Sequence, residues 1–159
     1  MRRPSGFTQV ELIGVIALIG IVAAVAIPRF ADRVGFDSRG FSDQLVNSLQ
    51  YARQQAVAQR RQMCVAVAAG GYAITRAPAP GGACDGTPLL APDTGAAYAA
   101  NVPNGVGVQG EGTTALPASI NFDPLGRPNA AAALRVTGDI PRCLRVEGET
   151  GYVRFVACS

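Results

Sequence analysis

Hydrophobic residues form one long unbroken stretch near the start of the chain. Residues 12–27 include no charged or strongly polar side chain, and the apolar run counted from Phe7 is 21 residues long. As an α-helix this run would measure about 31 Å, which matches a bilayer hydrocarbon core of about 30 Å. We therefore predict a membrane-spanning helix over residues 7–30, in which Pro28 would bend the axis.

One carboxylate interrupts this apolar pattern. Glu11 lies near the start of the run, where its side chain can approach the headgroups and avoid much of the cost of about 2.5–3.5 kcal/mol that a charge meets at mid-bilayer. It is either an interfacial residue without a special role or an acid retained for a partner cation. The pattern alone does not separate these two interpretations.

A second helical pattern follows the apolar run. From residue 41, apolar positions recur every three or four residues with polar residues between them, as in a helix that packs one side on a domain. We expect an amphipathic helix over residues 31–61, loosened or broken at 32–40, where two glycines fall, with Asp37 or Ser38 as its cap. The apolar positions are Phe41, Leu45, Leu49, Ala52 and Ala56.

The composition changes after residue 61. Most of the 11 prolines and 19 glycines lie there, between short β-type runs. This pattern predicts an α+β fold, in which the long N-terminal helix packs with its amphipathic half on a C-terminal antiparallel β-sheet domain, residues 62–159. The candidate strands are residues 63–68, 72–76, 106–109, 119–123, 134–137, 143–147 and 152–158, while 96–100 and 129–133 are ambiguous.

Charge and residue usage argue against several functions. Charged residues make up only 16% of the chain, and the net charge is +3, or +1 without the two arginines of residues 1–6. This charge is too small to indicate nucleic acid or an anionic surface. The chain has no His, the commonest general base and metal ligand. We predict no catalytic residue, metal or cofactor, with calcium binding by Asp123 or Asp139 as a minor alternative.

Residues 6–12 carry a specific motif. Gly6-Phe7-Thr8-Gln9-Val10-Glu11-Leu12, after a short basic leader and before the apolar run and Pro28, resembles the class III signal of type IV pilins and type II secretion pseudopilins. The resemblance implies that a prepilin peptidase removes residues 1–6 by cutting after Gly6 and then methylates Phe7. It also implies that Glu11 pairs with the N-terminal amine of a neighbouring subunit. The family usually has an aliphatic residue where Gln9 stands.

Two alternatives remain for the N-terminal segment. An ordinary secretory signal would use the basic leader, the apolar run and an Ala24-Val25-Ala26 cleavage site. Its apolar part would be longer than usual, and Glu11 would have no explanation. A generic single-pass anchor is the other alternative.

Three later segments extend the resemblance. Residues 41–56, 120–127 and 142–154 are similar to sequence blocks of GspH/FimT-type minor pseudopilins, and residues 28–30 are similar to mannose-sensitive haemagglutinin pilins. The resemblance implies a non-enzymatic subunit held in the inner membrane with a periplasmic domain, then assembled with other pilins into a pilus or pseudopilus. Its partners would be the prepilin peptidase, other pilins and the membrane. A secreted or anchored enzyme is a further alternative.

Four cysteines follow the apolar run, at Cys64, Cys84, Cys143 and Cys158. An even number in an exported domain indicates disulfides. If the apolar residues of the last two strands face the core, strand alternation places Cys143 and Cys158 together on the opposite face. The pairing Cys64–Cys84 then follows by elimination, as part of one of three connectivities.

Arginines near the C-terminus are the candidate ligand surface. Some FimT-type minor pilins bind DNA through a Gly-Arg-x-Arg motif on the last hairpin. In this chain Tyr152 replaces the first Arg of that motif, which leaves Arg154 with Arg142 and Arg145 nearby. These three arginines could hold phosphates, although two glutamates in the same hairpin oppose this. A DNA-binding minor pilin for DNA uptake is therefore the alternative function.

Overall fold

The structure, a computed structural model, describes residues 8–29 and 33–158, without side-chain detail for 24–34. The chain forms two compact units divided at residue 33. In the first unit, α1 runs from Gln9 to Arg29. No helix within the described residues is both long and apolar enough to cross a membrane. The span predicted over residues 7–30 therefore stays a prediction.

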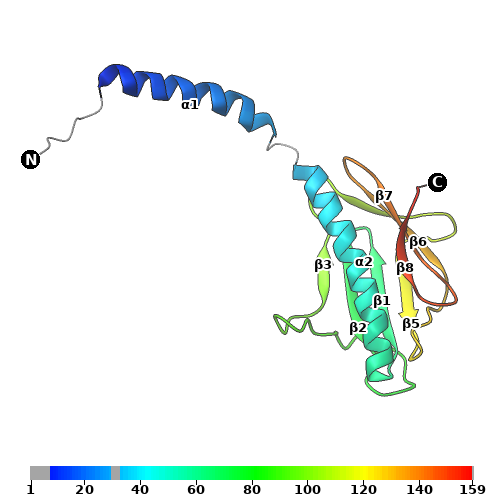
Figure 1. Ribbon diagram of the computed structural model, residues 1–159. Coiled ribbons are helices and arrows are strands. Elements are labelled where there is room, and N and C mark those ends of the chain that lie inside the picture. Colours follow the sequence, from blue (N-terminus) through cyan, green and yellow to red (C-terminus); the bar gives the residue numbers. More distant parts are fainter. Residues whose placement is uncertain (1–7, 30–32, 159) are drawn as a thin grey trace, which may run out of the picture. The chain divides into compact units, whose positions relative to one another are not determined.

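The second unit consists of α2 and eight strands in two antiparallel four-stranded sheets (Figure 1). The strand orders are β3-β2-β1-β5 and β4-β6-β7-β8. This arrangement confirms the α+β class, and it divides the expected β-sheet domain into two sheets. The elements are α2 Arg33–Gln59, β1 Met63–Ala68, β2 Gly71–Arg76, β3 Ala99–Asn101, β4 Gly107–Gly110, β5 Ala118–Phe122, β6 Ala132–Thr137, β7 Arg142–Val146 and β8 Val153–Val156.

The core lies between α2 and both sheets. All five apolar positions predicted to face the domain are at most 3% exposed, so the helical period is confirmed. On the first sheet, Tyr72 from β2 contacts the ring of Phe41 and shares a 2.6 Å hydrogen bond with Ser48. On the second sheet, the amide of Gln50 donates to the carbonyl of Val153 at 3.1 Å. The helix therefore joins the two sheets.

The predicted interruption before the amphipathic helix is wrong for residues 33–40, which are helical. Gly35 lies within the helix and does not end it. Its lack of a side chain lets the β6–β7 loop approach the helix. A Cβ at Gly35 would lie 3.3 Å from Oδ2 of Asp139. The predicted cap is also wrong, since Ser38 is buried inside α2 and its hydroxyl donates to the Gly35 carbonyl.

Arg53 of α2 connects the helix to turns from both sheets. Its Nε donates to the carbonyl oxygens of Gly126, at 3.2 Å, and Thr150, at 2.9 Å. These carbonyls belong to the turn after β5 and the turn before β8. A side chain at Gly151 would overlap the Gly126 carbonyl. The two turns can therefore pack together against the helix only with glycine at position 151.

Candidate functional site

The first turn of α1 holds the predicted assembly residue Glu11. Thr8 caps this turn, because its hydroxyl accepts the backbone N–H of Glu11 at 3.3 Å and its carbonyl accepts the N–H of Leu12 at 3.1 Å. A carboxylate in the first turn also interacts favourably with the helix dipole. The sequence analysis missed the cap, although Thr followed three residues later by Glu is a known N-terminal signal.

The apolar side chains of α1 are exposed from Val10 to Val22. Exposed apolar residues occur on all sides of this helix. A helix that is apolar on all sides normally lies inside a large core or a membrane. The large exposed apolar residues are Val10, Leu12, Ile13, Val15, Ile16, Leu18, Ile19, Ile21 and Val22. The processing residues Gly6 and Phe7 lie outside the described residues. Pro28 lies within the bounds of α1, but the structure does not describe its side chain.

The four cysteines form two disulfides, Cys64–Cys84 and Cys143–Cys158. This is the pairing expected from the sequence. The first bond ties the loop after β2 to β1, and the second ties the C-terminal segment after β8 to β7. Each bond closes a separation of at most 20 residues.

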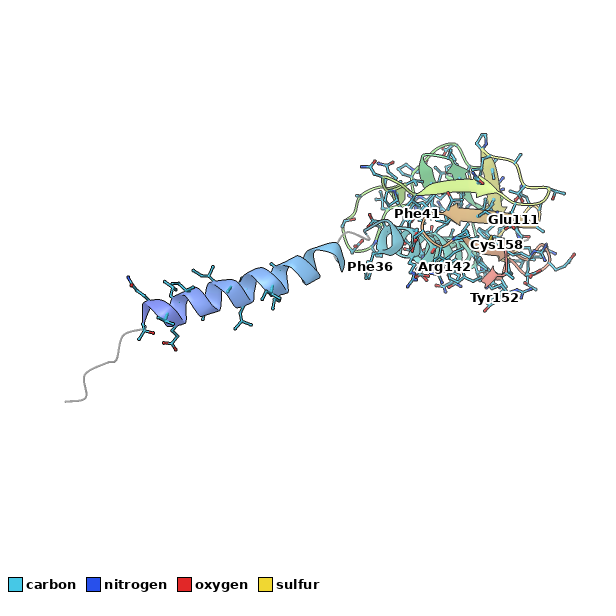
Figure 2. The ribbon with its side chains drawn as sticks, turned by 90° about the horizontal axis from the view of Figure 1, so that it is seen from above. Phe36, Phe41, Glu111, Arg142, Tyr152 and Cys158 are labelled. Atoms are coloured by element: carbon cyan, nitrogen blue, oxygen red, sulfur yellow. A yellow bond between two sulfur atoms is a disulfide. The ribbon has the colours of Figure 1, made fainter. Side chains whose placement is uncertain are left out.

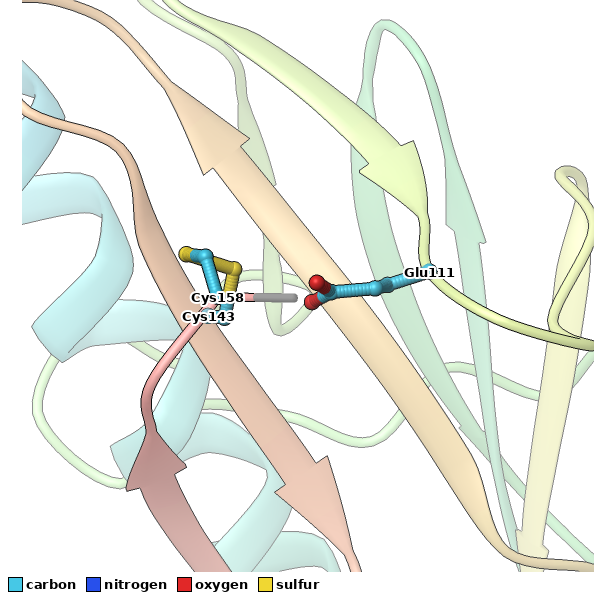
Figure 3. Close-up of side chains that lie close together, drawn as sticks. All are labelled: Glu111, Cys143 and Cys158. Atoms are coloured by element: carbon cyan, nitrogen blue, oxygen red, sulfur yellow. A yellow bond between two sulfur atoms is a disulfide. The ribbon is translucent and has the colours of Figure 1, made fainter.

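Glu111 lies beside the second disulfide (Figure 3). One carboxylate oxygen and the sulfurs of Cys143 and Cys158 lie within 4.8 Å of one another. The sulfurs are bonded to each other, so neither is a thiolate that could hold a metal. The carboxylate instead pairs with Arg135 of β6 at 3.0 Å.

Arg142 faces α2 and already has partners. Its Nη1 lies 2.9 Å from Oδ1 of Asp43 and 3.3 Å from the hydroxyl of Ser42. Its guanidinium also lies over the ring of Phe155, 4.0 Å from the centroid. Arg142 therefore contributes to holding the second sheet on α2.

Arg145 and Arg154 lie directly opposite each other on β7 and β8. Because side chains alternate along a strand, Arg145 is on the opposite face of the sheet from Arg142. Arg154 pairs with Glu147 through both Nε and Nη2, at 3.1 and 2.9 Å. The structure thus brings two of the three candidate DNA-contact arginines together and separates the third.

A hollow of about 360 Å³ adjoins Arg145. Arg145 and Val156 line it together with the segment after β4 and the alanines that open β6. Arg145 has no ion pair or hydrogen bond with any described residue. The lining combines the cation of Arg145 with the carboxylate of Glu111, the hydroxyls of Thr113 and Thr114, and small apolar walls.

Asp123 forms a tight turn with its own backbone. Its Oδ1 accepts the N–H groups of Leu125 and Arg127 at 2.9 and 2.8 Å, while Oδ2 accepts the Arg127 Nε at 3.0 Å. Desolvation opposes ionisation, but these donors and the guanidinium hold the pKa of Asp123 below its ordinary value. Both oxygens already have donors, so the turn explains this carboxylate without calcium. The other calcium candidate, Asp139, adjoins Gly35.

Sequence comparison gives two results. Residues 41–151 match the family described as type II transport protein GspH. Two curated relatives, both fimbrial proteins of Pseudomonas aeruginosa, are 33% identical to the chain over 63 residues. That match covers 40% of this chain and 41% of each relative, so the chain spans less than half the length of the curated relatives it matches.

Solved structures share the fold at low sequence identity. The type IV minor pilin FimU of Pseudomonas aeruginosa is 16% identical with a TM-score of 0.51, and the match covers 79% of this chain and 89% of FimU. The minor pseudopilin EpsH from the Type 2 Secretion System of Vibrio cholerae is 13% identical with a TM-score of 0.51, and the match covers 79% of this chain and 98% of EpsH.

Proposed function

The chain belongs to the GspH family of type II transport proteins, and on this basis we propose that its function is filament assembly. We propose also that it is not an enzyme. It is a minor pilin or pseudopilin of a type II secretion system or a type IV pilus. In the proposed mechanism, α1 anchors the subunit in the inner membrane. The helix then leaves the lipid to pack against the helices of other subunits.

The exposed apolar surface of α1 is the observation that carries this proposal. Val10 is 80% exposed and Ile13 67% exposed. Each fully exposed side chain of this size would gain about 1.5–3 kcal/mol on burial. The described residues of the chain leave this surface uncovered, so lipid or other helices must supply the cover.

Glu11 is the proposed register residue of the assembled filament. Peptidase cleavage after Gly6 would create a positively charged amine at Phe7, four residues before this carboxylate. An unpaired charge buried among apolar helices is strongly unfavourable, and removing one partner of a buried pair costs about 3–5 kcal/mol. A carboxylate on the adjacent helix can pair with the amine at only one axial position, which would fix how successive subunits align.

Substitution of Glu11 tests this mechanism. Glu11→Ala keeps the backbone N–H that donates to Thr8, so we expect normal α1 formation, membrane fractionation and cleavage after Gly6. We expect a large loss of this subunit from sheared pili or cross-linked pseudopili. Glu149→Ala is the matched control, since it removes an exposed carboxylate that lies outside α1. Equal recovery of wild type and Glu11→Ala in the filament fraction would disprove the pairing role.

DNA uptake receives no specific support from the geometry. Arg142 is paired with Asp43 on the face toward α2, and Arg154 is paired with Glu147. Arg145 is the one member of the proposed trio without an ion pair among the described residues. We therefore propose filament assembly alone.

A further inference from the structure

Two exposed apolar side chains mark the end of the domain where α2 begins. Phe36 is 80% exposed in the first turn of α2, and Ile140 is 51% exposed in the β6–β7 loop. The loop lies against the first turns of the helix, as the close approach of Asp139 to Gly35 requires (Figure 1). Figure 2 shows Phe36 at the edge of the domain, away from Tyr152. We call this pair the Phe36–Ile140 surface.

The chain itself keeps this surface close to the apolar segment. Arg29 ends α1 and Arg33 begins α2, and the four residue steps between them extend at most about 14 Å. Three further helical steps to Phe36 add about 4.5 Å. A bilayer's polar region is about 5–7 Å thick on each side. The four residue steps and the three helical steps together place Phe36 at most about 19 Å along the chain from the end of α1. A subunit anchored through residues 7–30 therefore holds Phe36 close to the headgroups.

The charges at this end are mixed. Arg39 lies three residues after Phe36, while Asp37 and Asp139 are exposed beside the two apolar residues. Both signs occur together, so the surface has no strong preference for anionic lipid. Attraction to a bilayer would come from apolar area, as in interfacial segments whose apolar residues enter the boundary between headgroups and acyl chains.

We infer that the Phe36–Ile140 surface is a membrane-contact surface, which rests on the outer boundary of the lipid while the subunit is stored before assembly. The inference rests on the anchoring proposed above. It adds a second, peripheral contact that orients the domain with α2 directed away from the bilayer. Extraction of the subunit must then release this surface as well as α1.

The absence of Trp from the sequence makes a direct test possible, because each substitution introduces a single indole. The variants are Phe36→Trp and Ile140→Trp at the proposed surface, Leu18→Trp in α1, and Leu125→Trp as control. Leu125 is 70% exposed and precedes Gly126, where a Cβ would lie 3.0 Å from Val57 of α2. Val57 is about 31 Å along the helix from Phe36.

The full chain is reconstituted in phosphatidylcholine vesicles with and without brominated acyl chains, which quench indoles in contact with lipid. We expect loss of emission in brominated lipid for Phe36→Trp, Ile140→Trp and Leu18→Trp, and unchanged emission for Leu125→Trp. Adding phosphatidylglycerol should leave the quenching unchanged, because apolar area carries the contact.

The outcomes separate this inference from the anchoring proposal. Quenching of Leu18→Trp without quenching at Phe36 or Ile140 would overturn the inference and leave anchoring intact. Absence of quenching at Leu18 would overturn both. Equal quenching of Leu125→Trp would overturn the inference, because no particular end of the domain would then face the lipid. A requirement for phosphatidylglycerol would overturn its apolar basis.

Discussion

Gly151→Ala should destabilise the protein strongly, because Gly151 lies where both sheets meet α2. Its φ is +66°, a region that costs a residue with a Cβ about 1–2 kcal/mol. The new Cβ would overlap the Gly126 carbonyl and lie 3.2 Å from Cδ of Arg53 and Cε1 of Phe122. Overpacking of this kind typically adds about 1–3 kcal/mol. These two terms add to about 2–5 kcal/mol, and a gain of about 0.4–1 kcal/mol from the stiffer unfolded chain leaves an expected loss of about 1.5–4.5 kcal/mol, or about 5–14 °C in Tm.

Gly95→Ala is a close control for this prediction. Its φ is +67°, and its N–H donates to a carbonyl four residues earlier, as does that of Gly151. A Cβ at Gly95 would meet nothing within 4 Å. Backbone strain of about 1–2 kcal/mol, partly offset by a gain of about 0.4–1 kcal/mol from the stiffer unfolded chain, leaves a loss of about 1 kcal/mol. Thermal unfolding of the full chain in detergent, followed by near-UV circular dichroism, compares the two. Equal losses would refute the crowding argument.

Two further predictions concern the core and the second disulfide. Tyr72→Phe should cost about 1 kcal/mol, because it removes the hydrogen bond to Ser48, whose hydroxyl still donates to the Gln44 carbonyl. Burial raises the pKa of Tyr72 above 10.0 despite that bond, so the wild type should lose stability as pH rises from 10 through the folded pKa. In urea titrations at about pH 9 and 11, the unfolding free energy of Tyr72→Phe should fall less than that of the wild type. An equal fall in both proteins would count against burial of Tyr72 as the cause. Replacing both Cys143 and Cys158 by Ser should lower the unfolding free energy by about 3 kcal/mol for a separation of 15 residues, and an unchanged urea midpoint would contradict this.

Local patterns predicted the elements whose burial is regular. In α2 the spacing of residues such as Leu45 and Leu49 identified the face that meets the domain, because the helical repeat alone decides which side chains share a side. The first hairpin was readable because two β-type runs, residues 63–68 and 72–76, flank the glycines at positions 70 and 71. The pairing of Cys143 with Cys158 also followed from alternation.

Features that depend on contacts between distant segments were not readable from the sequence. The division into two sheets depends on the pairing of Met63 with Phe122, for which no local signal exists. The start of β6 lies in a run of alanines, which have low β propensity, so Ala132 gave no strand signal. Gly35 was interpreted as a break because its role, close approach of Asp139, involves a loop a hundred residues later.

Arg142 shows the same limit at the candidate ligand surface. Sequence proximity grouped it with Arg145 and Arg154, whereas its odd separation from Arg145 places it on the other face of β7. Its partner Asp43 is 99 residues away. Charge counts along a hairpin therefore overestimated the number of arginines that one ligand could meet.

Mass spectrometry of the N-terminus of the mature protein tests the account most directly. Filament assembly through α1 requires a free amine close to Glu11, so the protein recovered from its native membrane should begin at a methylated Phe7. A chain that begins at Ile27 would have lost Glu11 and the apolar helix, as expected of an ordinary secretory signal. That result would contradict the proposed assembly mechanism.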